Sequence, residues 1–163
     1  MKKLVIVNGS MGVGKSAVCE KLYKRLNTSV WLDGDWCWMM NPFTVTDENI
    51  NMVQNNIISL LNSFLHNSSF RYVIFSWVIH LEEIFDTILG DIDTEEYDLY
   101  KFTLMCSEET LRRRILGRAG GTVESADRSI ARLALYEKMD TVKIDTTDLS
   151  PELAAERIIE IIG

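Results

Sequence analysis

Residues 2–22 read KKLVIVNGSMGVGKSAVCEKL, an apolar run followed by a glycine-rich loop and a helical pattern. Gly9, Gly14, Lys15 and Ser16 fit the spacing G-x-x-x-x-G-K-[ST] without a mismatch. Glycines let successive backbone N–H groups turn towards a phosphate, and the helix that follows adds the positive end of its dipole. The sequence therefore predicts a phosphate loop between a strand and a helix, formed by Gly9, Ser10, Met11, Gly12, Val13, Gly14, Lys15, Ser16 and Ala17.

The same motif predicts ATP and Mg²⁺ as ligands. In loops of this kind the lysine, here Lys15, reaches the β- and γ-phosphates, and the hydroxyl that follows it, here Ser16, is a Mg²⁺ ligand. The motif indicates what is bound, and leaves open whether the phosphate is transferred, hydrolysed or sensed.

Composition excludes several classes of protein. The chain has 163 residues and a net charge of −7, which argues against nucleic-acid and anionic-membrane binding. No apolar run approaches the roughly 20 residues of a membrane span. Three cysteines without a CxxC spacing suggest neither a disulfide framework nor a zinc site. We expect a single cytoplasmic domain over residues 1–163, a monomer or a dimer, with no nucleic-acid or membrane partner.

Short apolar runs alternate with segments of helical period, which predicts an α/β fold with a largely parallel sheet. Thr46, Ser107 and Ser150 are the expected N-caps of three of the helices. The predicted strands cover residues 4–8, 29–33, 72–78, 99–106 and 141–145. The predicted helices cover residues 15–26, 47–66 and 108–116, a segment that begins at 151, and less clearly 81–89.

Two carboxylates, Asp33 and Asp35, follow the second predicted strand in the sequence WLDGDW, residues 31–36. Ligands of open α/β sheets bind outside the carboxyl ends of the strands, and alternate residues there can face the same way. One carboxylate could hold Mg²⁺ while the other accepts the proton of an attacking hydroxyl. The alternative interpretation is an exposed Asp-Gly turn without a function.

Four segments together resemble the small P-loop kinase group: GSMGVGKS (9–16), DGD (33–35), LMCSEETLRRRI (104–115) and IDTTDLSPELAAERI (144–158). That group includes shikimate and gluconate kinases, chloramphenicol phosphotransferase, tunicamycin-resistance proteins and nucleotide kinases. The resemblance implies a three-layer P-loop NTPase fold, with five parallel strands in the order 2-3-1-4-5 and helices on both faces. It also implies an acceptor-binding segment at about 34–70 and a lid at about 112–128. In the shikimate kinase pattern the first aspartate helps to hold the metal and the second binds the acceptor, and Asp33 and Asp35 match those places.

Six arginines lie between residues 112 and 132 of this acidic chain. Guanidinium groups match the equatorial oxygens of a phosphoryl group in transfer. Arg118, Arg128 and Arg132 loosely match the arginines that contact phosphates in the nucleotide-kinase pattern, so the resemblance implies a catalytic role for them. Arg112 and Arg113 are instead expected on a solvated basic face.

The acceptor segment carries no positive charge, since residues 27–70 contain neither Lys nor Arg. This favours an uncharged hydroxyl acceptor, unless a lid arginine or Arg71 reaches over. Lys15 and Asp35 are then the catalytic pair, with Asp35 as the base. Trp36, Trp38 and Trp77 could stack on the acceptor, although large apolar residues are more often buried in a core.

Three functions remain in competition. The first is an ATP- and Mg²⁺-dependent small-molecule kinase that transfers the γ-phosphoryl group to a hydroxyl. The second is a nucleoside or nucleotide kinase that acts on a monophosphate. The third is a regulatory module that binds ATP without transferring anything. Motor ATPases and GTPases are disfavoured, because the strand at 72–78 ends without a carboxylate and the chain has no Asn-Lys-x-Asp.

Overall fold

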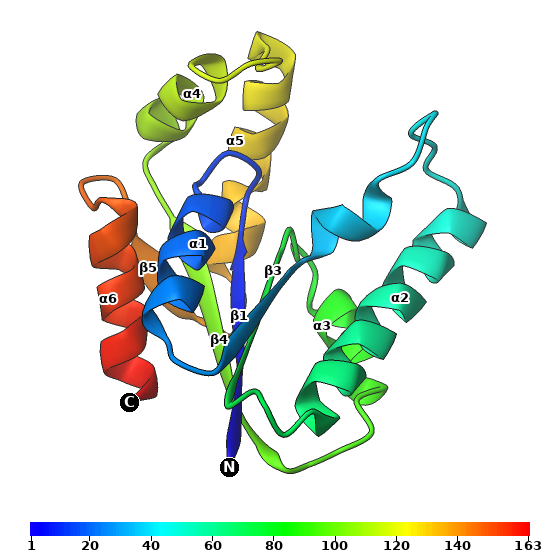
Figure 1. Ribbon diagram of the computed structural model, residues 1–163. Coiled ribbons are helices and arrows are strands. Elements are labelled where there is room, and N and C mark those ends of the chain that lie inside the picture. The colour runs from blue at the N-terminus through cyan, green and yellow to red at the C-terminus, as the bar shows by residue number, and fades with distance from the viewer.

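The computed structural model describes residues 1–163, and its centre is a five-stranded parallel sheet (Figure 1). The strand order is β2-β3-β1-β4-β5, which confirms the order implied by the resemblance. Every predicted strand is present, with ends that move by up to two residues. The strands are β1 (Lys2–Gly9), β2 (Ser29–Asp33), β3 (Tyr72–Trp77), β4 (Tyr97–Met105) and β5 (Val142–Asp145).

Helices cover both faces of the sheet and give the three layers of the predicted fold class (Figure 1). One face packs against α1 (Lys15–Arg25) and α6 (Pro151–Ile162), and the other against α2 (Asp47–His66) and α3 (Glu82–Gly90). Two more helices, α4 (Glu108–Leu116) and α5 (Val123–Glu137), connect β4 to β5 along the chain and pack against each other. A short 3₁₀ helix, η1 (Gly34–Trp38), follows β2 directly.

The central strand β1 shows why its sequence is an unbroken apolar run. Leu4 and Ile6 point into the core under α2 and α3, while Val5 and Val7 point into the core under α1 and α6. Successive side chains of a strand alternate between the two faces, so a strand that is covered on both sides has no polar face. Because all five strands are parallel, their carboxyl ends lie at one edge of the sheet, and the phosphate loop begins at that edge.

The expected helix caps are present. Thr46, Ser107 and Ser150 each accept a hydrogen bond from the backbone N–H three residues on. A fourth cap, Thr122, forms a reciprocal capping box with Ser125 at the start of α5. This capping box fixes the point where the chain turns back after the tip between α4 and α5.

None of the helices combines the length and the apolar character that a membrane crossing requires.

Candidate active site

The phosphate loop joins β1 to α1 with three glycines at positive φ. Gly12, at φ 88°, lies against α4, and a β-carbon there would be 2.4 Å from Ile115 Cγ1. Gly14, at φ 105°, is the residue before α1 and has no neighbour in the way of a β-carbon, so its requirement is conformational. The conformation of the loop is thus restricted by packing at Gly12 and by backbone geometry at Gly14. The loop also lines a cavity.

Lys15 folds back over the loop to which it belongs. Its Nζ donates hydrogen bonds to the carbonyl oxygens of Gly9 (2.8 Å) and Ser10 (3.0 Å). Burial lowers the pKa of Lys15 to about 8, against the opposing effect of the Asp35 and Asp33 carboxylates. The ammonium group is therefore buried at a position where bound phosphate oxygens would offset the free-energy cost of its desolvation.

Ser16 and Asp33 bring two oxygen ligands together beside the loop. Ser16 Oγ donates to Asp33 Oδ2 at 3.1 Å, and the other carboxylate oxygen accepts the backbone N–H of Asp35 at 3.0 Å. Hydroxyl and carboxylate oxygens suit Mg²⁺, which typically takes one or two protein ligands and completes its shell with phosphate oxygens and water. The chain has no group of three or more His, Cys, Asp or Glu side chains that could hold a metal alone.

Asp35 is exposed at the start of η1, two residues beyond the buried Asp33. Desolvation and the neighbouring Asp33 carboxylate raise the pKa of Asp35, while Lys15 and the Trp77 side chain lower it. A carboxylate whose pKa is moved upwards is a better proton acceptor than a free one.

A first cavity of about 430 Å³ lies over the phosphate loop. Its walls are the loop, the two aspartates, one arginine of α4 and one just after α4, and the turn that leads into α6. Among its lining residues are Lys15, Ser16, Asp33, Asp35, Arg114, Arg118, Thr146 and Leu149.

A second cavity of about 290 Å³ adjoins the first. Met11, Asp35 and Val78 line both cavities and form their common wall. The remaining lining residues come from the phosphate loop and from α5: Ser10, Arg128, Ser129, Arg132 and Tyr136.

Asn8, at the end of β1, fixes one part of that wall. It is fully buried, and its amide exchanges two hydrogen bonds of 2.7 Å with the backbone N–H and carbonyl of Ile79. This pairing holds the chain after β3, including Val78, against the carboxyl end of the sheet.

The three arginines predicted for catalysis divide between the cavities. Arg118 lines the first, and Arg128 and Arg132 line the second. Arg112 has the expected surface role, because its guanidinium pairs with Asp127 at 2.8 Å on the neighbouring helix α5.

Arg114 is a site residue that the sequence analysis did not assign. Its guanidinium donates to the carbonyl of Val13 (3.0 Å) and to both the hydroxyl (3.0 Å) and the carbonyl (2.7 Å) of Thr146. It thereby ties the phosphate loop to the turn after β5. The available signal was its spacing of four from Arg118, which places the two on one helical face.

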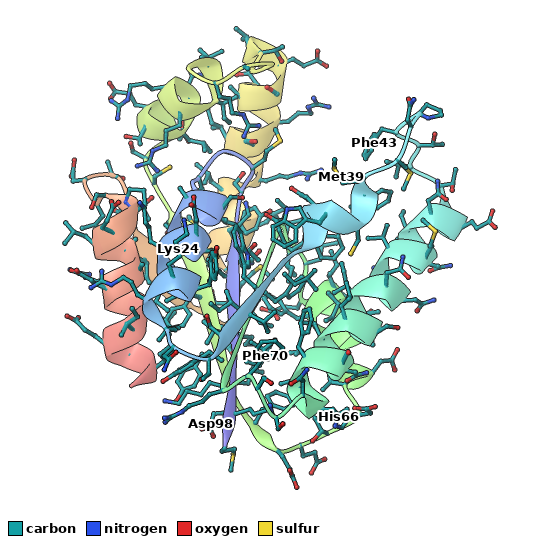
Figure 2. All side chains as sticks on the ribbon, viewed as in Figure 1. Lys24, Met39, Phe43, His66, Phe70 and Asp98 are labelled. Carbon is teal, nitrogen blue, oxygen red and sulfur yellow. The ribbon has the colours of Figure 1, made fainter.

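The tryptophans predicted for the acceptor lie close to the site without lining either cavity. Trp36 is half exposed and packs on Trp31 with ring centroids 5.0 Å apart. Trp38 packs on Phe43 at 5.6 Å. Figure 2 shows Met39 and Phe43 on the connection between η1 and α2, which projects from the body of the molecule. The indole of Trp77 packs against Gly34, and this side chain lowers the pKa of the Asp35 carboxyl group.

A family model described as AAA domain matches residues 5–134, about four-fifths of the chain. A search of curated proteins found no significant match. Many solved structures share the fold, and three of them match nearly the whole chain at low identity. The tunicamycin resistance protein of Deinococcus radiodurans is 18% identical, with a TM-score of 0.72 over 100% of this chain and 96% of that one.

The other two are described as kinases. A sugar kinase from Janibacter sp. HTCC2649 is 16% identical, with a TM-score of 0.73 over 99% of this chain and 95% of that one. A gluconokinase from Sinorhizobium meliloti 1021 is 18% identical, with a TM-score of 0.65 over 99% and 95%. These likenesses confirm the predicted fold, that of the small P-loop kinases.

Proposed function

The chain belongs to the AAA domain family, and from this premise we propose that it is an ATP- and Mg²⁺-dependent kinase. Its reaction is the transfer of the γ-phosphoryl group of ATP to a hydroxyl group of a small molecule. One observation carries the proposal: Asp35 borders both the cavity over the phosphate loop and the cavity beside it. A base at that junction can contact the hydroxyl group of an acceptor in one cavity beside the γ-phosphate of ATP in the other.

The first cavity is the proposed ATP site. The triphosphate lies in the phosphate loop, with Lys15 turned from the Gly9 and Ser10 carbonyls to the β- and γ-phosphates. Ser16 and Asp33 hold Mg²⁺, which when bound neutralises charge on the phosphate oxygens. The base portion extends towards the turn that contains Thr146 and Leu149.

The second cavity is the proposed acceptor site. The acceptor hydroxyl lies against Asp35, which takes the hydroxyl proton as the oxygen attacks the γ-phosphorus. A bond forms between that oxygen and phosphorus, and the bond from phosphorus to the β–γ bridging oxygen breaks. Its electron pair leaves with ADP, so atoms and charge balance without another reactant.

Positive charge around the transferred group comes from the arginines. Arg118 is placed to act from the ATP side, and Arg128 and Arg132 from the acceptor side. None of the three makes an ion pair or a side-chain hydrogen bond within the protein, so their guanidinium groups are free for ligands. The segment between α4 and α5 that carries Arg118 is the proposed lid, and Trp36 and Trp38 remain candidates for contact with a larger acceptor once it closes.

The geometry supports transfer over hydrolysis or sensing. β3 ends in Ser76 and Trp77, so no carboxylate stands where a motor ATPase activates water. A module that only sensed ATP would have no need of a second cavity joined to the first by a carboxylate.

The nucleotide-kinase alternative is favoured by one feature, the pair of arginines in the second cavity, which could bind a monophosphate. A phosphate acceptor is already ionised and needs no base. The two reactions are therefore separated by their dependence on Asp35.

The test is ADP release from MgATP against a panel of hydroxyl compounds and nucleoside monophosphates, with Lys15→Ala as the blank. Stimulation by a hydroxyl compound supports the proposal, and stimulation by monophosphates alone supports the nucleotide kinase. Tight ATP binding without stimulation by any acceptor would support the regulatory module.

A further inference from the structure

Helix α2 differs from the other helices in its lack of charge. Its only acidic or basic side chains are Asp47 and Glu48 in the first turn and His66 in the last, and residues 49–65 contain none. The other five helices are 9 to 15 residues long, yet each carries three to five Asp, Glu, Lys or Arg residues. At 20 residues, α2 is therefore both the longest helix and the one with the fewest of these side chains.

The uncharged part of α2 is exposed on one side. Val53, Ile57 and Leu61 pack into the core, while the opposite side of the helix faces solvent at the border of the molecule (Figure 1). Residues four apart follow one another along one side of a helix, so the exposed residues form one continuous surface, the α2 face. It consists of Asn51, Asn55, Ser59 and Ser63 in one row and Met52, Asn56 and Leu60 in the next.

The composition of the α2 face is not that of a solvated helix. Five of its seven residues are Asn or Ser, which favour a helix less than Lys, Glu, Gln or Ala. The other two, Met52 and Leu60, are 43% and 37% exposed. Depletion of charged residues and enrichment in methionine are typical of the centre of a protein interface.

The partner that suits this face is a second copy of the chain. Each copy has a net charge of −7, so two copies repel one another where acidic surfaces approach, and the α2 face is free of that repulsion. An amide carries both donors and an acceptor, so Asn can pair with another Asn, whereas a charged side chain repels its own kind. A twofold axis requires such self-complementarity. A partner of opposite charge would gain nothing from this face.

We propose that the protein forms a twofold-symmetric dimer in which the α2 faces of two copies pack antiparallel. A parallel pair would bring the Asp47 and Glu48 carboxylates of both copies together, whereas an antiparallel pair separates them by nearly the length of the helix, about 30 Å. It also sets the two helix dipoles in opposite directions. Asn56, in the middle of α2, then faces its own counterpart near the axis. The dimer goes beyond the proposed function and does not depend on it.

The size of the α2 face sets the expected affinity. The face of a helix of this length is about 30 Å long and about 10 Å wide. This is a small area beside the roughly 800 Å² that each partner buries in a standard interface. We therefore expect a reversible dimer with a Kd roughly in the micromolar range rather than a permanent one.

Sedimentation velocity on the full chain measures this association directly. Protein concentrations from about 1 μM to about 1 mM span the expected Kd. The fraction of dimer should rise across this range and no larger species should form, because a twofold interface closes on itself. A monomer at every concentration, or growth beyond the dimer, would overturn the inference.

Charges of either sign at Asn56 locate the contact. Asn56→Glu and Asn56→Lys each place like charges opposite one another across the axis, and each should raise the Kd of the dimer by at least about tenfold. The two variants change the net charge in opposite directions, so a loss in both is not an effect of net charge. An equimolar mixture of the two should regain the dimer, with Glu opposite Lys. A dimer that survives either substitution, or a mixture that stays monomeric, would contradict the proposed axis.

Leu153→Glu and Leu153→Lys are the matched controls. Leu153 is 48% exposed on α6, which covers the opposite face of the sheet from α2. These variants add the same charges and should leave the Kd of the dimer unchanged, and thermal unfolding verifies that all four variants are folded. An equal loss of dimer in the Leu153 variants would place the contact elsewhere and overturn the inference.

Discussion

Gly34 lies directly against the indole of Trp77, so that a β-carbon on residue 34 would be 2.5 Å from Trp77 Cγ. The glycine between the two aspartates is therefore set by packing rather than by a turn that needs positive φ. This contact brings the start of η1 close to the end of β3. It also decides where the carboxylates of Asp33 and Asp35 lie relative to the phosphate loop.

Replacing Gly34 by alanine should displace η1 from Trp77. We expect a loss of about 1–3 kcal/mol in the free energy of unfolding, typical of an overpacked site, together with reduced turnover because both aspartates move. Thermal unfolding and kcat measure the two effects. Gly90→Ala is the matched control, since no atom lies within 4 Å of its added β-carbon. A Gly34→Ala protein that matches the unmodified one in both measurements would show that the contact is not required.

Asp35→Asn should slow transfer by about 10²–10⁴-fold while it leaves ATP binding intact. The amide keeps the size of the side chain but cannot accept the hydroxyl proton, and general-base catalysis contributes about 10²–10⁴-fold. Steady-state kcat and the calorimetric affinity for MgATP distinguish the two effects. Asp98→Asn is the control, because Asp98 is exposed at the amino end of the sheet, at the opposite end from the phosphate loop (Figure 2). Unchanged turnover in Asp35→Asn would exclude its role as the base.

Lys15→Met should stabilise the nucleotide-free protein while it inactivates it. The pKa of Lys15 is about 8 in the folded chain against an ordinary value of 10.5, so the unfolded chain binds more protons between those values. The contribution of Lys15 to the free energy of unfolding is lowest below pH 8 and rises as the pH increases towards 10.5. The methionine variant should have a higher melting temperature at neutral pH and should lose this part of the pH dependence. A lower melting temperature at pH 7 would contradict the expected cost of burying the ammonium.

Arg114→Gln should weaken ATP binding more than it slows transfer. The guanidinium holds the Val13 carbonyl and Thr146 together without touching Asp35 through a hydrogen bond. Loss of these charge-assisted bonds should raise KM for ATP by about tenfold, with a smaller change in kcat. Thr146→Val should reproduce part of the effect and Thr146→Ser should not, because serine keeps the accepting hydroxyl. A fall in kcat at constant KM would instead place Arg114 in the chemical step.

Local patterns were sufficient to predict most of the fold. The helix at 47–66 and its cap Thr46 follow from apolar spacing and a side chain suited to capping, and the structure has the same bounds. The phosphate loop follows from its glycines and lysine. The strand order could not come from local pattern alone, and was implied by the resemblance to the small P-loop kinases.

The second cavity could not be predicted from the sequence, because its walls come from segments that are far apart along the chain. Met11, Val78 and Tyr136 meet only when the loops after β1 and β3 and the face of α5 converge at one edge of the sheet. Tyr136 looks like any core tyrosine in the sequence, and nothing local shows that it lines a cavity. The packing of Gly34 on Trp77 is hidden in the same way, since an Asp-Gly pair is common in turns.

The common wall of the two cavities has a stereochemical consequence. Met11, Asp35 and Val78 border both spaces, so the proposed donor and acceptor sites lie side by side and can be filled at the same time. A phosphoryl group then passes between them in one displacement and need not be carried on a protein side chain. ATP made chiral at the γ-position with sulfur and oxygen isotopes should therefore give a product of inverted configuration at phosphorus, whereas retention would reveal a covalent phosphoenzyme and two successive displacements.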